Sequence, residues 1–529
     1  MSIDAMLTLI FCHLGPRPPS FADENSNVLL MQDWLNNCRL NHVTCNDVTK
    51  DFIPTRLLDL EAFNGSSPTF EDDIKLVCLN SNKFGRNELP PYITLSHCWG
   101  PPEKRPVTTT QTNLTAKMAK IPFGDLPRTF RDAVVVTRKL GQRYLWIDSL
   151  CIIQDDVNDW AKEAAMMAKV YAQSYCTLAA LCSSDSTKGL RMSSEPREKE
   201  TLIVDLSAND GDRGPFNMRL FVTRRELWHS EYNGPLLTAE ETNPLRYRAW
   251  VLQEKELSTK NMHFGLHQLL WECRELKATS QLPWHLSATP HEPPPEPTWA
   301  ETQSEMTLRW LNLTEEYSKR ALTKQTDKLP ALSGIAQSFQ KYFPNDRYIA
   351  GVWSSHLPLA FLWRPARYHG YVRRERYPTD YVAPIWSCVY HPDEITCEWW
   401  VPRYFSQKFG DGGDTSDIMS KWVRKPDVEI ADIIGQPKHG DAYGALEEGA
   451  ALKLRSARLF EIDAKLGNVS RYVEGVSFFK DGKFAGTFVP DAGGPYPGKM
   501  VCLSIFKHSN LGDRGLRLLY RTHAHGTNS

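Results

Sequence analysis

An acidic residue on a predicted helix is the first candidate for chemistry in this sequence. Glu163 lies in the helix predicted over residues 158–172, beside Trp160, Met167 and Val170 on the helical wheel. A carboxylate on that apolar flank would lose part of its solvation, which raises its pKa. It would then suit a general base or a stabiliser of cationic sugar chemistry. The alternative is structural, with Glu163 bonded to a neighbouring loop or to an arginine.

A second carboxylate, Asp148, lies in an apolar run from Tyr144 to Ile153. The composition of this run predicts a strand that is buried on both faces of a sheet. Asp148 would then lie at the rim of that sheet. Its carboxylate could bind a ribose hydroxyl there, or it could only cap the following turn.

Ser96, His97 and Cys98 suggest a nucleophile and its base. However, adjacent residues of a strand point to opposite faces, so His97 cannot readily serve either neighbour, and we expect no triad from this segment alone. The turn at Gly100 could bring the backbone close to a ligand. Trp99 could stack on that ligand or belong to the core.

A third segment begins at Arg248 and has a helical pattern. Helical spacing puts Trp250 on a face next to that of Gln253 or Glu254. These side chains could close a ligand pocket. Equally, Arg248 could pair with an acidic residue of the preceding segments and hold the fold together.

Two further sequence patterns resemble binding sites, one for a metal ion and one for a phosphate group. Cys38, His42 and Cys45 offer three soft metal ligands, but the sequence shows no obvious fourth, so we predict no metal site. The segment 493–499 imitates a phosphate-binding loop. Met500 replaces the Ser or Thr that such a loop requires, which excludes nucleoside triphosphate binding there.

The elements around these residues alternate between strand and helix. This alternation predicts an α/β domain with a parallel, doubly wound sheet, whose ligands gather at the carboxyl ends of the strands. The capping pattern Thr129-x-x-Asp132 is expected to start the first helix. The predicted strands span 92–99, 144–153 and 175–181, and the predicted helices span 129–140 and 158–172.

Three blocks of this sequence resemble the fungal HET (heterokaryon incompatibility) domain family. The middle block is the most specific, because it contains Arg143-Tyr-Leu-Trp-Ile-Asp-Ser-Leu-Cys-Ile-Ile-Gln-Asp155 followed by Trp160-x-x-Glu163. The resemblance extends over about 34–363 and is strong over 92–273. The blocks are 92–100, 126–180 and 248–254.

The resemblance implies a TIR-like or flavodoxin-like parallel sheet flanked by helices. It also implies an effector of self/non-self recognition and regulated cell death, which acts with other incompatibility or signalling proteins or as a homo-oligomer. Because some TIR domains hydrolyse NAD, it makes NAD a candidate substrate, with Glu163 and then Asp148 as the catalytic residues. A second alternative is a small-molecule enzyme of secondary metabolism built on the same fold.

Composition and charge restrict the binding partners and the cellular compartment that we expect for the protein. The 62 Lys and Arg residues balance 63 Asp and Glu residues, so no global field favours nucleic acid or an anionic membrane. The apolar run 6–11 is far shorter than the roughly 20 residues of a membrane span. The 12 Cys residues are scattered along a long chain, which predicts reduced thiols and a cytoplasmic location.

A chain of 529 residues exceeds what one hydrophobic core usually supports, so we expect two structural domains. An N-terminal extension over 1–30 precedes a HET domain over 31–285, with its core at 90–275. A proline-rich linker follows over 286–300. The remainder, 301–529, is expected to be helical and then β-rich, giving a mixed α+β part.

Overall fold

The computed structural model divides into two compact units, Met1–Pro297 and Thr298–Ser529. The proline-rich linker predicted over 286–300 lies outside the described residues. The structure describes residues 11–13, 24–46, 51–63, 69–79, 89–190, 201–210, 214–223, 243–266, 268–280, 303–357, 360, 363–365, 380–384, 386–391, 394–397, 428–438, 441–456, 459–470, 473–480, 483–488, 498–504 and 517–520.

An eight-stranded sheet forms the centre of the first unit, with the order β11-β10-β9-β6-β4-β5-β2-β3. The four central strands, β9, β6, β4 and β5, are parallel, as predicted. On either side of them β10 and β2 run antiparallel to the centre, and the edge strands β11 and β3 pair antiparallel with β10 and β2. The fold is therefore α/β with a mixed sheet. The strands are β2 (Leu57–Asp59), β3 (Lys75–Val77), β4 (Tyr92–Ser96), β5 (Tyr144–Ile147), β6 (Cys176–Ala179), β9 (Lys260–Phe264), β10 (Leu269–Cys273) and β11 (Lys277–Thr279).

The parallel strands follow the order of flavodoxin-like sheets. The chain runs from β4 to β5 on one side, and then crosses back over β4 to β6 on the other. Ligands of such sheets bind outside the carboxyl ends of the strands, at the point where the order of the strands in the sheet reverses. In this chain that place is the end of β4, where Ser96 to Gly100 follow.

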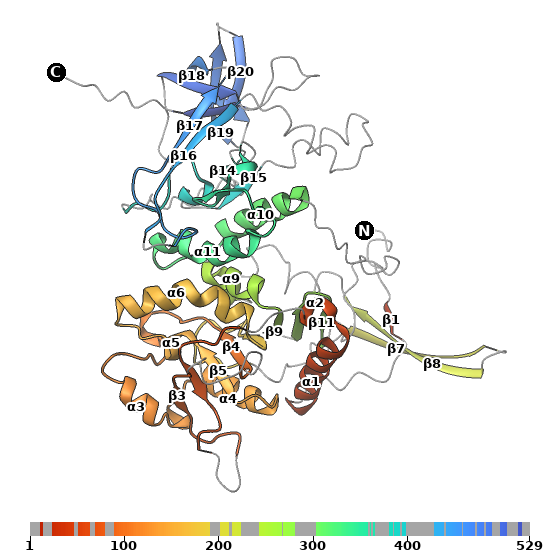
Figure 1. Cartoon of the computed structure of the whole chain (residues 1–529). Helices are drawn as coiled ribbons and strands as arrows, with labels where there is room; N and C mark the ends of the chain where they lie inside the picture. Colours follow the sequence, from red (N-terminus) through yellow and green to blue (C-terminus); the bar gives the residue numbers. More distant parts are fainter. Residues whose placement is uncertain are drawn as a thin grey trace. The chain divides into compact units, whose positions relative to one another are not determined.

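Helices cover both faces of the sheet (Figure 1). The helix α4 (Arg128–Lys139) lies on one face, while α6 (Val157–Ala172) and α9 (Ala249–Leu257) lie on the other. Alternate residues of β4 reach the two layers: the Tyr92 hydroxyl donates to the Val170 carbonyl of α6 at 2.8 Å, and the His97 ring lies 4.9 Å from the Phe130 ring of α4.

Two local predictions were wrong. The apolar run that was predicted as one strand to Ile153 leaves the sheet at Asp148, where the short helix α5 (Asp148–Cys151) begins. Both conformations are buried, so hydrophobicity alone cannot separate them. The side chains of Thr129 and Asp132 do not cap their own helix. They accept hydrogen bonds from the backbone of Gly189 at 3.1 Å and of Leu190 at 2.8 Å, and thereby hold the loop after β6.

Two N-terminal helices, α1 (Glu24–Asn41) and α2 (Val43–Asn46), lie beside the β10 end of the sheet (Figure 1). The Trp34 ring stacks on Trp271 of β10 with 6.0 Å between centroids. The Gln32 amide donates to the Lys139 carbonyl at the end of α4 at 2.8 Å. The first unit also contains α3 (Leu114–Ala119) and a separate antiparallel sheet of β1 (Phe11–His13), β8 (Gly214–Thr223) and β7 (Thr201–Asp210).

The second unit joins two helices, α10 (Gln303–Ser318) and α11 (Lys328–Phe339), to several antiparallel sheets, which confirms its mixed, β-rich character. The buried Trp310 makes edge contacts with Phe339, Tyr348 and Trp353. Its strands are β12 (Tyr348–Ile349), β13 (Val352–Trp353), β14 (Trp363–Pro365), β15 (Ile395–Cys397), β16 (Val428–Ile434), β17 (Ala451–Ser456), β18 (Leu459–Ser470), β19 (Val473–Lys480), β20 (Lys483–Phe488), β21 (Gly498–Ser504) and β22 (Arg517–Tyr520). Among the described residues of the chain, no helix has both the length and the apolar character to cross a membrane.

Candidate functional site

A group of polar side chains gathers at the carboxyl ends of β4 and β5. The Asp148 carboxylate lies at its centre. One of its oxygens is 3.0 Å from His97 Nε2 and accepts the Ser149 backbone N–H at 2.7 Å. The other accepts the indole N–H of Trp99 at 2.8 Å. Three donors thus fix this carboxylate at the rim of the sheet.

Arg248 brings the third sequence block to the same place. It precedes the first residue of α9, and its guanidinium donates to the carbonyl oxygen of His97. Its positive charge also acts on the carboxylates of Asp148 and Glu254. We call these residues the rim cluster: Ser96, His97, Trp99, Asp148, Arg248 and Glu254.

Glu254 is the second carboxylate of the rim cluster and is only 5% exposed. Burial raises the pKa of Glu254, and Arg248 and Ser96 offset the effect of burial only in part. Neither Glu254 Oε2 nor the Ser96 hydroxyl has a hydrogen-bond partner within the described part of the chain. Ser96 therefore lies close enough to influence Glu254 without the geometry of a full hydrogen bond.

The pKa values of the two rim-cluster carboxylates, Asp148 and Glu254, are shifted in opposite directions. Burial alone would raise the pKa of Asp148, but His97, Arg248 and Trp99 outweigh burial and hold it below the usual range. The pKa of Glu254 is raised by burial instead. Environments that push the pKa values of two neighbouring acids apart are typical of acid–base pairs in active sites.

Residues 92–254 match the family model of the heterokaryon incompatibility protein (HET). They begin at the first residue of β4, end at Glu254, and include the whole rim cluster. These residues form a HET domain. No curated protein and no solved structure matches the chain.

The alternating faces of β4 separate the hydroxyl and imidazole groups of the HET domain. Ser96 lies on the side of α9, near Glu254, whereas His97 lies on the side of α4 and contacts Asp148 and Phe130. This arrangement agrees with the expectation that the segment forms no triad by itself. Burial raises the pKa of Cys98 to about 11, so this residue is a neutral thiol at pH 7.

Gly100 occupies a position that only glycine fits easily. Its φ is +76°, and a Cβ added there would lie 2.6 Å from Cβ of Asp185. The glycine therefore lets the turn after β4 pack against the loop after β6. Together the two segments build the rim of the HET domain.

Glu163 lies in a different group of side chains, which we call the Arg56 cluster: Arg56, Asp159 and Glu163. The Arg56 guanidinium pairs with Asp159 and lies 3.6 Å from Glu163 Oε1, and its Nε donates to the Cys151 carbonyl at 2.6 Å. Burial raises the pKa of Glu163, and Thr55 and Arg56 counteract burial only in part. Glu163 is thus desolvated, as expected, and also has an arginine partner.

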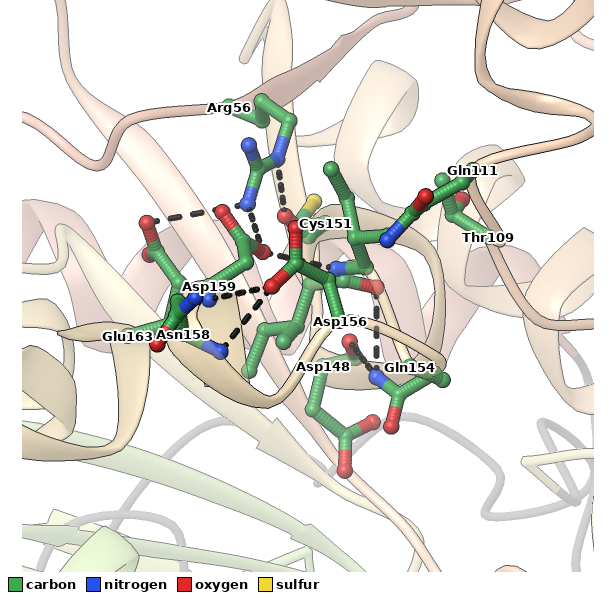
Figure 2. Close-up of polar contacts among 12 residues, drawn as sticks. Arg56, Thr109, Gln111, Asp148, Cys151, Gln154, Asp156, Asn158, Asp159 and Glu163 are labelled. Carbon is green, nitrogen blue, oxygen red and sulfur yellow. Dashed lines mark hydrogen bonds and ion pairs between the residues drawn. The ribbon is translucent and has the colours of Figure 1, made fainter. Parts of the chain in front are cut away.

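Asp148, the first residue of α5, lies apart from the Arg56 cluster in Figure 2. The Asp148 carboxylate points away from Arg56, Asp159 and Glu163 in this view. The Gln154 amide donates to the backbone carbonyl of Asp148 at 3.1 Å and ties the loop after α5 to the rim. The structure therefore places the two predicted catalytic residues, Asp148 and Glu163, in separate polar environments.

The remaining predicted site residues differ in exposure. Trp160 is 36% exposed on α6, which places it outside the buried stripe expected for that helix. Gln253 is buried in α9, and Trp250 is half-buried against the core. Sequence reasoning missed Arg56, because it lies far before the HET domain and no motif marks it.

Proposed function

We propose that this chain acts in heterokaryon incompatibility as an effector, and that the rim cluster of its HET domain cleaves the N-glycosidic bond of NAD or a related nucleotide. The observation that carries the proposal is the convergence of all three sequence blocks on two neighbouring carboxylates, the half-buried Asp148 and the buried Glu254, whose pKa values are shifted in opposite directions. The cluster also lies where flavodoxin-like sheets bind nucleotides.

The chemistry of the bond fits two carboxylates of this kind. Nicotinamide leaves with the electron pair of the C1′–N bond and becomes neutral, so it needs no proton. Water supplies the new C1′–O bond, and a carboxylate must accept its proton. Glu254, with its raised pKa, suits that base, while the ionised Asp148 suits a developing positive charge on the ribose.

A direct test is to incubate the purified full chain with NAD in ¹⁸O-labelled water. We expect nicotinamide and ADP-ribose with one ¹⁸O at C1′. A variant with both Glu254→Gln and Asp148→Asn, prepared in parallel, controls for contaminating hydrolases. Equal release by the double variant, or no release by folded wild type with any nicotinamide nucleotide, would remove the catalytic part of the proposal.

The effector part needs a cellular test. We expect induced expression in a fungal host to arrest growth, and the double variant at equal protein level to permit it. We further propose that the protein acts in the cytoplasm, together with other incompatibility proteins or with further copies of itself. Healthy growth at high levels of the wild type would contradict an autonomous effector.

The burial of the rim cluster favours a second candidate, a signalling module without catalysis. Ser96, His97 and Glu254 are each at most 5% exposed, so ligand access depends on the more exposed side of Asp148 and Trp99. In this case the cluster would only hold the three blocks in register. The double variant would then change folding stability but would release no less nicotinamide than the wild type.

A further inference from the structure

Three cysteines and one histidine meet in the first unit, away from the rim cluster. Cys38 of α1, His42 between the helices, Cys45 of α2 and Cys273 at the end of β10 each offer one ligand atom. These four atoms all lie within 4.8 Å of one another. The three cysteines are buried and the histidine is half-buried.

The fold brings a fourth ligand, Cys273, to the three that are close in sequence. Cys38, His42 and Cys45 are close in sequence, and three ligands alone do not complete a structural zinc site. Cys273 comes from more than 200 positions further along the chain, where β10 ends beside α1 and α2. We propose that Cys38, His42, Cys45 and Cys273 form a structural Zn²⁺ site.

The distances suit a tetrahedral ion. Bond lengths of about 2.3 Å to sulfur and about 2.1 Å to nitrogen place neighbouring sulfur and nitrogen ligands about 3.6 Å apart. The observed distances from His42 Nδ1 are 3.3 Å to the Cys273 sulfur and 3.9 Å to the Cys45 sulfur. Thiolate-rich tetrahedral sets with one imidazole select zinc over magnesium or calcium, which require oxygen ligands.

Neighbouring groups already orient the ligands. The Asn46 amide donates to the carbonyls of Cys38 at 3.0 Å and His42 at 2.6 Å, which fixes the link between α1 and α2. The Leu276 backbone N–H donates to the Cys273 sulfur at 3.2 Å. The Asn37 amide nitrogen lies 3.4 Å from His42 Nε2, and the Asn37 oxygen accepts the Asn41 amide at 2.7 Å, so Asn37 links the imidazole to the end of α1.

The position of the site defines its role. It would fasten α1 and α2 to the end of β10, where Thr44 donates to the Glu275 carboxylate at 2.6 Å and Arg274 donates to the Thr44 carbonyl at 3.0 Å. All four ligands lie outside residues 92–254, so the zinc would support the HET domain from its flank. With four protein ligands the ion keeps no open position, which makes it structural and not catalytic.

The test is elemental analysis of the full chain, purified under reducing conditions without metal-affinity steps. We expect about one zinc per chain for wild type and at least a fivefold lower content for Cys273→Ser. Cys78→Ser removes an exposed free cysteine and should leave the content unchanged. His42→Cys keeps four soft ligands and should retain zinc, which separates loss of a ligand from general disruption.

Cobalt substitution of the wild type keeps the proposal testable even when Cys273→Ser does not fold. We expect intense thiolate-to-cobalt charge-transfer bands together with the d–d bands of a tetrahedral ion. Zinc-free wild type without these bands, equal zinc in wild type and Cys273→Ser, or a disulfide between two of the three cysteines would each overturn the proposal.

Discussion

The rim cluster and the Arg56 cluster are built from similar parts. Each combines one arginine with two carboxylates. In the Arg56 cluster the guanidinium pairs directly with Asp159 and lies within ion-pair distance of Glu163. In the rim cluster Arg248 donates to the carbonyl of His97, and its positive charge lowers the pKa of Asp148 and of Glu254.

This difference suggests separate roles for the two clusters, one in stability and one in catalysis. Arg56 pairs directly with the half-buried Asp159 and offsets part of the cost of burying Glu163. In both clusters one oxygen of the buried glutamate, Oε1 of Glu163 or Oε2 of Glu254, has no hydrogen-bond partner among the residues described. The rim cluster differs in its second carboxylate, because the pKa of Asp148 is held below the usual range. Arg56 also comes from outside the HET domain, whereas the rim cluster is assembled within it. We therefore propose that the Arg56 cluster stabilises the fold and that the rim cluster is the reactive one.

The largest expected effect is on activity in the rim cluster. Asp148→Asn keeps the size of the side chain but removes the negative charge that faces the ribose, so nicotinamide release should fall by about 100- to 10,000-fold. Asp72→Asn changes an exposed carboxylate that bonds to Thr69 and should leave the rate unchanged. An equal loss of activity in Asp148→Asn and Asp72→Asn would mean that the assay reports folding, and it would remove the evidence for reactivity in the rim cluster.

The next effect is on stability in the Arg56 cluster. Arg56→Met leaves the buried Glu163 and the half-buried Asp159 without their partner and should lower the free energy of unfolding by about 3–5 kcal/mol. The matched control is Lys277→Met, because Lys277 is half-exposed and its partner Glu272 keeps Lys255 nearby. The control should cost at most about 1 kcal/mol. Denaturant titration measures both, and similar midpoints would contradict the structural role of Arg56.

A smaller effect is expected at the turn that builds the rim. Gly100→Ala adds a Cβ at a positive φ and 2.6 Å from Asp185, which should cost about 1–3 kcal/mol. Gly124→Ala is the control, since a Cβ there meets no atom within 4 Å. Thermal unfolding of the two variants compares them. An unchanged unfolding temperature for Gly100→Ala would show that the loop after β6 moves aside for the added Cβ at little cost in stability.

The smallest effect is a pH dependence of stability that differs in sign between Asp148 of the rim cluster and Glu163 of the Arg56 cluster. The folded-state pKa of Asp148 is lowered, so its contribution to stability is present above about pH 3.9 and is lost as the pH falls. The folded-state pKa of Glu163 is raised, so its contribution is present below about pH 4.3 and is lost as the pH rises.

Between pH 7 and pH 3 the stability advantage of wild type over Asp148→Asn should therefore shrink. Over the same range the advantage over Glu163→Gln should grow. Denaturant midpoints at a series of pH values measure both trends. Parallel trends for the two variants would mean that the clusters do not differ electrostatically in the way described.

The sequence predicted the parts of the fold that depend on local pattern. Alternating strands and helices were enough for the parallel centre of the sheet, and the strand ends placed Asp148 beside His97 and Trp99. The break at Asp148 could not be predicted, because both a strand and a helical turn bury Ser149 to Ile153 equally well.

Long-range partners account for what the sequence could not provide. Glu163 was recognisable as a desolvated acid, but its partner Arg56 lies more than 100 positions away and carries no motif. Cys273 is hidden in the same way from Cys38, His42 and Cys45. The antiparallel edge strands were also unpredictable, since they depend on which segments return to the sheet.

The most direct test of the account compares Glu254→Gln with Glu163→Gln in one assay of nicotinamide release, each normalised to folded full-length protein. Both variants replace a buried acid whose pKa is raised with its neutral amide. We predict a loss of at least about 100-fold for Glu254→Gln and a change within about threefold for Glu163→Gln. The reverse order, or equal losses, would contradict the assignment of reactivity to the rim cluster.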